Sequence, residues 1–248
     1  MRPAQIIVPQ WSAEEFEKLV LDIEPRVAVF DCDGTLWSGD SGYGFMVWSI
    51  EQGLVSRSTS DWIDNRHRSY RAGKVSEMQI CGEMVQIYAG LRELELQSAA
   101  EQYVREFVHA RVFEEMAGLI GALRKRKVEL WACSSTNKWV VAEGVRQFGI
   151  PSDHVLAAEV TTVGGVIGSE ILGVPTDEGK AASLVRAGLP HPDAVFGNSI
   201  HDLAMLEIAA HAFPVNPSPA LLEAAGRNGW GYFRPAAAAG IEARVDGE

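Results

Sequence analysis

The sequence has few cysteines, no excess of positive charge and no long apolar run. Its three cysteines, Cys32, Cys81 and Cys133, are too few for a disulfide framework, and none lies in a CxxC metal motif. The 248 residues include 22 Lys and Arg against 33 Asp and Glu, which gives a net charge of −11. Because nucleic acids and anionic membranes attract clustered positive charge, we expect neither as a partner.

The sequence also lacks the signals that direct a chain into or across a membrane. No stretch reaches the roughly 18 apolar residues that a membrane-spanning helix needs. The N-terminal segment has only a short apolar patch, broken by Pro9, and it lacks the uninterrupted apolar core of a signal peptide. Together with the free thiols, these absences predict a cytoplasmic protein. The sequence does not indicate an oligomeric state.

Apolar runs of strand length alternate with helical patterns over most of the chain. Strands are predicted at 26–30, 128–133, 193–197, 212–215 and 230–233, and a β-hairpin at 157–174 that turns near Gly164 and Gly165. Helices are predicted at 12–23, 114–126, 137–148, 179–187, 200–210 and 218–227. This alternation predicts an α/β fold with a Rossmann-like, doubly wound parallel sheet as its core.

The segment between the first two predicted strands has a different pattern, with many charges and aromatics and no convincing strand. Helices are predicted there at 43–52, 59–72, 76–89 and 94–110. We therefore predict two domains: an α/β core of residues 1–38 and 113–248, and an inserted all-helical cap domain of residues 39–112.

Polar residues follow the predicted strands at the points where those strands end. In an open α/β sheet, ligands bind beyond the carboxyl ends of the strands. The residues at these ends include two carboxylates, several hydroxyls and an amide: Asp31, Asp33, Thr35, Ser134, Ser135, Thr136 and Asn198. Asp202 follows a helical turn later, and Lys180 opens the helix that precedes the strand at 193–197. Carboxylate and amide oxygens suit Mg²⁺, whereas Lys and hydroxyl groups suit phosphoryl oxygens. The sequence thus predicts a site for a divalent cation and a phosphate group.

Four segments, in this order, resemble the motifs of the haloacid dehalogenase-like hydrolase superfamily: DCDGTLW at 31–37, ACSSTNKWV at 132–140, DEGKAAS at 177–183 and GNSIHDLAML at 197–206. The position of the helical insertion resembles the phosphoserine-phosphatase-like branch. The resemblance implies a Mg²⁺-dependent phosphatase that hydrolyses a small phosphomonoester through an aspartyl-phosphate intermediate.

The resemblance also implies a role for each motif residue. Asp31 would be the nucleophile, and Asp33 would act as general acid and then as general base. Ser134, Lys180 and the loop amides of Gly34 and Thr35 would hold the phosphoryl oxygens. Mg²⁺ would be bound by Asp31, the main-chain carbonyl of Asp33, Asn198 and Asp202. Ser135 is expected either to cap helix 137–148 or to contact the substrate.

Position 198 departs from the family pattern, because it is Asn where the fourth motif usually has Asp. The amide oxygen can still bind Mg²⁺, but the site has one negative charge fewer. A second possibility is therefore a catalytically weakened member that binds a phosphorylated metabolite without hydrolysing it. A phosphomutase is a further alternative within the enzymes.

Substrate choice is expected to depend on the cap. Asp40 lies nine residues after Asp31, where phosphoserine-phosphatase-like proteins often place an acid that meets a substrate amine. Trp37, Tyr43 and other aromatics lie nearby in the sequence. We predict a small metabolite phosphate that carries an amine or a hydroxyl group. The six histidines are scattered singly without ligand spacing, so they are expected on the surface or in the core.

Overall fold

A six-stranded sheet forms the centre of the fold in the computed structural model, which describes residues 8–238. Residues 1–7 and 239–248, which belong to the predicted core segments, lie outside the described part. The strand order is β5-β4-β3-β2-β6-β7. The strands are β2 (Val27–Phe30), β3 (Glu129–Asn137), β4 (Val155–Val163), β5 (Val166–Gly173), β6 (Ala194–Gly197) and β7 (His211–Pro214). All neighbouring pairs are parallel except the β4–β5 hairpin.

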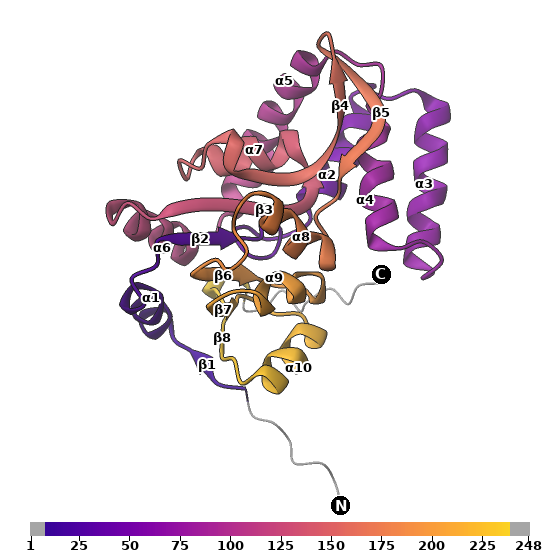
Figure 1. Ribbon diagram of the computed structural model, residues 1–248. Helices are drawn as coiled ribbons and strands as arrows, with labels where there is room; N and C mark the ends of the chain where they lie inside the picture. Colours follow the sequence, from indigo (N-terminus) through magenta and orange to yellow (C-terminus); the bar gives the residue numbers. More distant parts are fainter. Residues whose placement is uncertain (1–7, 239–248) are drawn as a thin grey trace, which may run out of the picture.

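Helices pack on both faces of this sheet (Figure 1). They are α1 (Ala13–Asp22), α6 (Glu114–Lys125), α7 (Lys138–Arg146), α8 (Glu178–Arg186), α9 (Leu203–Glu207) and α10 (Pro219–Asn228). Side chains alternate along β2: Ala28 and Phe30 belong to the core cluster that includes α1 and α6, whereas Val29 belongs to the cluster that includes α8, α9 and α10. The predicted doubly wound α/β fold is confirmed, and the hairpin turns at Gly164 and Gly165.

Two very short strands form a separate parallel pair beside the main sheet. β1 (Gln10–Trp11) pairs with β8 (Tyr232–Phe233), the strand predicted at 230–233. The ring of Phe16 stacks on that of Phe233, with 4.4 Å between ring centroids. The sequence did not predict β1, because two residues are too few to show a strand periodicity.

All the named secondary-structure elements of the insertion between β2 and β3 are helices. It contains α2 (Ser41–Glu51), α3 (Arg57–Arg71), α4 (Glu77–Gln86) and α5 (Glu93–Tyr103). Asp40, Ser56 and Ser76 cap the first three of these helices through their side-chain oxygens. The predicted helix 94–110 is shorter than expected. After Tyr103 the chain continues as a π-helical turn, Val104–Val108, and a 3₁₀ turn, His109–Arg111.

The β4–β5 hairpin reaches beyond the sheet and is hydrogen-bonded to the helical insertion. Figure 1 shows it rising beside α4 and α5. The Gly90 N–H donates to the Ile167 carbonyl at 2.8 Å, and the Ile167 N–H donates to the Leu91 carbonyl at 2.9 Å. The Gln86 side-chain amide donates to the Ser169 carbonyl at 2.6 Å. The sequence pattern did not predict these contacts between the core hairpin and the insertion.

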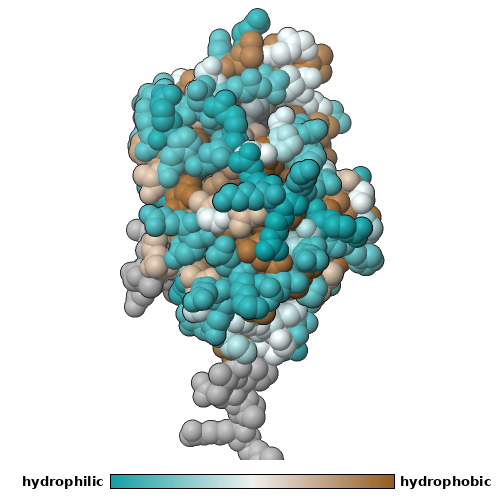
Figure 2. All heavy atoms as spheres, turned by 90° about the vertical axis from the view of Figure 1, so that its left-hand side faces the viewer, coloured by the Kyte–Doolittle hydropathy of each residue, from teal (hydrophilic) through white to brown (hydrophobic). Residues whose placement is uncertain are grey.

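The surface is mainly hydrophilic on the face shown in Figure 2, where apolar residues form only small patches. This distribution agrees with the acidic composition of the chain. Among the helices that the structure describes, none is both long and apolar enough to cross a membrane.

A stack of three phenylalanine rings gives a test of the core. The ring of Phe196 lies 4.4 Å from that of Phe30 and 5.1 Å from that of Phe213, centroid to centroid. Phe196→Ala should lower the free energy of unfolding by about 3–5 kcal/mol, because it leaves a cavity between the rings of Phe30 and Phe213. Denaturant unfolding measures this loss. Leu19→Ala, at a partly exposed position of α1, should change stability by less than about 1 kcal/mol; an equal loss in both variants would contradict the prediction.

Candidate active site

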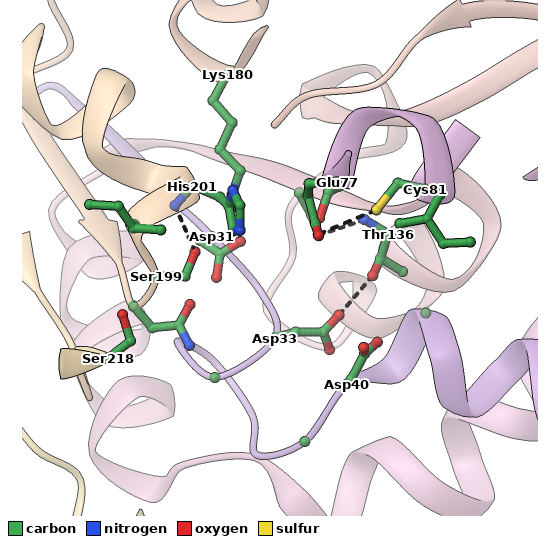
Figure 3. Close-up of a pocket in the computed structure, with 18 of the residues that line it drawn as sticks. Asp31, Asp33, Asp40, Glu77, Cys81, Thr136, Lys180, Ser199, His201 and Ser218 are labelled. Atoms are coloured by element: carbon green, nitrogen blue, oxygen red, sulfur yellow. Dashed lines mark hydrogen bonds and ion pairs between the residues drawn. The ribbon is translucent and has the colours of Figure 1, made fainter. Parts of the chain in front are cut away.

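A cavity of about 660 Å³ lies at the carboxyl ends of the parallel strands, where the core meets the helical insertion. The core lines it with Asp31, Asp33, Ser134, Lys180 and Asn198. The insertion lines it with residues that include Asp40 and Glu77. Figure 3 shows the acidic side chains facing a common space, with Glu77 extending from α4 on the side opposite Asp33. The structure therefore brings most of the predicted site residues together in one cavity.

Lys180 joins two of the predicted carboxylates at the base of this cavity. Its ammonium donates to Asp31 Oδ1 at 2.7 Å and to Asp202 Oδ1. The side chains of all three residues are at most 8% exposed. The Thr35 hydroxyl donates to the second oxygen of Asp31 at 2.9 Å. Residues of the first and third motifs thus donate to the Asp31 carboxylate, and Asp202 of the fourth motif holds the lysine in place.

Burial raises the pKa of Asp31 to about 7, and the negative charge of Asp202 acts in the same direction, whereas Lys180 opposes it. Burial acts to lower the pKa of Lys180, but the carboxylates of Asp202 and Asp31 outweigh it and hold that pKa well above its usual value. One ammonium therefore neutralises only one of two buried carboxylates. The remaining negative charge favours a further cation at Asp31.

Three donors orient the carboxylate of Asp33. Its Oδ1 accepts from the Trp37 indole N–H at 2.6 Å and from the Ser41 amide at 2.8 Å. Its Oδ2 accepts from the Thr136 hydroxyl at 2.7 Å. Trp37 and Ser41 lie on the segment that leads into the helical insertion, so the start of the insertion holds this carboxylate at the cavity wall.

The turn after β2 differs from the prediction in its amide contacts. We predicted that the Gly34 and Thr35 amides hold phosphoryl oxygens. The Gly34 amide instead donates to the Trp37 carbonyl at 2.7 Å, and the Thr35 amide donates to the Cys32 carbonyl at 3.1 Å. These bonds close the turn. Gly34 has a φ of +78°, and a Cβ there would lie 1.9 Å from Asn198 Nδ2, so this turn requires glycine for both reasons.

Ser134 is buried at the end of β3 and lines the cavity. Its hydroxyl oxygen accepts from the Thr136 amide at 3.2 Å, which leaves its own proton available to a ligand. Ser135 also lines the cavity. It does not cap the following helix, as one of the two predictions for it had proposed. Asn137 caps α7 by accepting from the Val140 amide at 2.9 Å.

Asn198 and Asp202 occupy different places, although both belong to the fourth motif. Asn198 lines the cavity against Gly34. Asp202 is fully buried, and its Oδ2 accepts from the amides of Asn198 and Ser199 at 2.8 and 2.9 Å. With Lys180 on its other oxygen, Asp202 is committed to holding this loop and the lysine. The arrangement favours a positioning role for Asp202 over direct metal coordination.

The chemistry of the oxygen donors at the strand ends fits a magnesium ion. Asp31 offers a carboxylate with uncompensated charge, Asn198 an amide oxygen and Asp33 a main-chain carbonyl. Within residues 8–238, no group of three or more His, Cys, Asp or Glu side chains is arranged to hold a metal ion. A magnesium site here therefore depends on the amide and carbonyl oxygens as well as on Asp31.

Several cavity residues were missed by the sequence analysis. Thr136 follows the strand predicted at 128–133 but was given no role, and Glu77 was not singled out. His67 and His201 were expected on the surface or in the core, but both line the cavity. His201 Nδ1 lies 2.7 Å from an oxygen of Asp177. The one signal in the sequence was the position of His201, next to Asp202 in the fourth motif.

A family model described as haloacid dehalogenase-like hydrolase matches residues 28–207, well over half of the chain. The chain belongs to this family. The sequence-based identification and the prediction of an enzyme are therefore confirmed. A probable phosphatase of Mycobacterium tuberculosis is 26% identical over 211 residues, which cover 82% of this chain and 73% of that protein. A histidinol-phosphatase of Neisseria meningitidis is 23% identical over 215 residues, covering 83% of this chain and 96% of the relative.

Solved structures share the fold at low sequence identity. A protein of unknown function from Bordetella pertussis superposes with a TM-score of 0.75 and 23% identity, covering 84% of this chain and 98% of that one. A phosphoserine phosphatase, solved as a phospho-aspartyl intermediate analogue, gives a TM-score of 0.55 and 15% identity over 85% of this chain and 93% of its own. Similarity at this level of sequence identity shows that the chain shares the fold of these two structures.

Removing the cation between the two buried carboxylates should destabilise the protein. Lys180→Met should lower the free energy of unfolding by about 3–5 kcal/mol at pH 8 in the presence of a chelator. Without Lys180, the folded-state pKa of Asp31 rises further above its unfolded value, so the loss should shrink as the pH falls from 8 toward 5. Denaturant unfolding at several pH values checks both effects. A loss that stays constant with pH would contradict the electrostatic explanation.

Proposed function

We propose that the protein is a Mg²⁺-dependent phosphomonoester hydrolase that acts on a small phosphorylated metabolite through an aspartyl-phosphate on Asp31. The observation that carries this proposal is the buried Asp31 carboxylate, held by Lys180 and Thr35 at the base of a cavity that Asp33 and Ser134 also line. The phosphatase names of both relatives and the phospho-aspartyl form of the neighbouring structure support it.

In the first step, a carboxylate oxygen of Asp31 attacks phosphorus and forms a new P–O bond while the ester P–O bond breaks. Asp33 gives its proton to the departing alkoxide oxygen. Ser134 and Lys180 stabilise the charge on the transferring phosphoryl oxygens. In the second step, Asp33 takes a proton from water, and the water oxygen attacks phosphorus and releases Asp31 and inorganic phosphate.

A bound Mg²⁺ would neutralise charge on the phosphoryl oxygens and on Asp31. Asp31, the Asp33 carbonyl and Asn198 are the proposed ligands, with Asp202 fixing the loop that carries Asn198. We also propose that residues 39–112 act as the cap domain and residues 1–38 and 113–248 as the core. The cap then excludes bulky substrates and bulk water from the cavity, which favours a small metabolite over a protein or nucleic acid.

A phosphate-release screen tests the function directly. With Mg²⁺, the protein should hydrolyse p-nitrophenyl phosphate and members of a panel of small phosphometabolites that includes histidinol phosphate, chosen because one relative is named for it. Asp31→Asn should lower kcat by at least about a thousandfold, because it removes the nucleophile. Activity that survives this substitution would reject Asp31. Phosphate binding without release would favour a binding protein, and transfer to a second hydroxyl would favour a phosphomutase.

Asn198 gives a second test, because restoring the usual carboxylate adds one negative charge at the metal. Asn198→Asp should lower the Mg²⁺ concentration needed for half-maximal activity by roughly tenfold, by a charge–charge attraction of about 1.4 kcal/mol. Isothermal titration calorimetry with Mg²⁺ in the absence of substrate measures the affinity for Mg²⁺ independently of turnover. The control is Asp153→Asn. Asp153 lies on a 3₁₀ turn, and its side chain does not line the cavity. Unchanged or weaker Mg²⁺ binding in Asn198→Asp would contradict the assignment of Asn198 as a ligand.

A further inference from the structure

The part of the cavity formed by the insertion carries two carboxylates, Asp40 and Glu77. Asp40 precedes α2, and its Oδ1 accepts from the Tyr43 amide at 2.8 Å. Glu77 lies in the first turn of α4. Figure 3 shows Asp40 beside Asp33 and Glu77 on α4 across the cavity from them. A ligand in this space therefore meets acidic groups from two helices of the insertion.

Asp40 and Glu77 interact electrostatically across this space. Although Asp40 keeps contact with solvent in the open cavity, the enclosing protein raises its pKa to about 7, and the negative charges of Asp33 and then Glu77 act in the same direction. Mutual repulsion of this kind is relieved when a cation lies between the carboxylates.

Few hydrogen-bond donors contact the carboxylate of Glu77. Its Oε1 accepts from the thiol of Cys81 at 3.4 Å, and an S–H group is a weak donor. Its Oε2 is buried and accepts no hydrogen bond from the described residues. A buried carboxylate oxygen without a donor is costly, and an ammonium group supplies both the missing donor and the opposite charge.

The cavity offers no comparable partner for a carboxylate of the substrate. Among the described residues that line it, Lys180 is the only Lys or Arg, and it is committed to Asp31 and Asp202. Burial, and then the charge of Arg71, lower the pKa of His67, which favours the neutral form of this ring. His201 is hydrogen-bonded to Asp177 and also interacts electrostatically with Glu77, so this ring is already engaged by acids of the protein. A substrate carboxylate in the cap half of the cavity would face carboxylates without a free cation beside it.

Part of the cavity wall that the insertion forms is apolar. Ile80, Met84 and Val85 of α4 line the cavity, together with Phe113 where the chain returns to the core. These side chains suit a hydrocarbon or aromatic group on the substrate. The cavity, at about 660 Å³, is large enough for such a group beyond the phosphate.

We propose that the substrate is the phosphate ester of an amino alcohol, with a protonated amine, an apolar or aromatic body and no carboxylate, and that Glu77 together with Asp40 binds its ammonium group. This inference rests on the proposed phosphatase function and adds to the contact predicted at Asp40. It makes Glu77 a specificity-determining residue and excludes amino-acid phosphates such as phosphoserine as good substrates.

Four substrates that differ stepwise separate the effect of the amine on turnover from the effects of a carboxylate and of an aromatic body. Ethyl phosphate has neither charged group, phosphoethanolamine adds the amine, and phosphoserine adds a carboxylate to phosphoethanolamine. Phenylalaninol phosphate keeps the amine and adds an aromatic body. We expect kcat/KM for phosphoethanolamine to exceed that for ethyl phosphate and for phosphoserine by about tenfold or more, from one charge-assisted hydrogen bond. Phenylalaninol phosphate should be better still.

Variants at position 77 assign the preference to Glu77. Glu77→Gln should lower the ratio of kcat/KM for phosphoethanolamine to that for ethyl phosphate by about tenfold, mainly through KM. Glu77→Lys should shift the preference toward phosphoserine, which a merely structural role of Glu77 would not produce. Glu95→Gln makes the same charge change at an exposed position of α5 and should leave all ratios unchanged.

The outcomes distinguish this inference from the function on which it rests. If p-nitrophenyl phosphate is hydrolysed in an Asp31-dependent reaction but phosphoserine equals or exceeds phosphoethanolamine, the inference is overturned while the phosphatase function stands. Ratios unchanged in both Glu77 variants would likewise reject Glu77 as the amine contact. If no phosphate ester, p-nitrophenyl phosphate included, is hydrolysed, the proposed function fails and the inference fails with it.

Discussion

The buried ion pair of Lys180 with Asp31 and Asp202 is the interaction on which the site depends. It connects the ends of two parallel strands with the helix that follows the hairpin, because Asp31 follows β2, Asp202 follows β6 and Lys180 lies on α8. Two carboxylates and one ammonium are stable together inside the protein only when each is hydrogen-bonded, and the Thr35 hydroxyl and the Asn198 and Ser199 amides provide these bonds. The excess negative charge then favours a cation at Asp31.

Much of this arrangement could be predicted from the sequence, for a physical reason. Parallel strands bring their carboxyl ends to one edge, so polar residues directly after apolar runs converge there whatever lies between them. Asp31, Ser134 and Asn198 were found in this way. The main-chain hydrogen bonds of the turn after β2 could not be predicted, because the sequence fits amides of Gly34 and Thr35 that bind phosphate and amides that close the turn equally well. The strand β1 could not be predicted either, because two residues are too few to show a strand periodicity.

The insertion was predicted as helical, but its contribution to the cavity was not. Helical periodicity shows which face of α4 is apolar and does not show what that face is packed against. Glu77 resembles any acid that stabilises the first turn of a helix. Only the packing of α4 over the strand ends makes its carboxylate part of the cavity. The same holds for His201, whose neighbour Asp202 was recognised while the histidine itself was not.

The hydrogen bonds between the β4–β5 hairpin and the insertion also bear on movement. Because main-chain bonds join Ile167 to Gly90 and Leu91, the insertion cannot swing away from the core without either breaking them or taking the hairpin along. The hairpin in turn continues from Gly173 of β5 into the short loop before Asp177 and Lys180. Displacement of the helices over the cavity would therefore also displace the segment that carries Lys180, so that access to the cavity and the position of this lysine are linked through a single stretch of backbone.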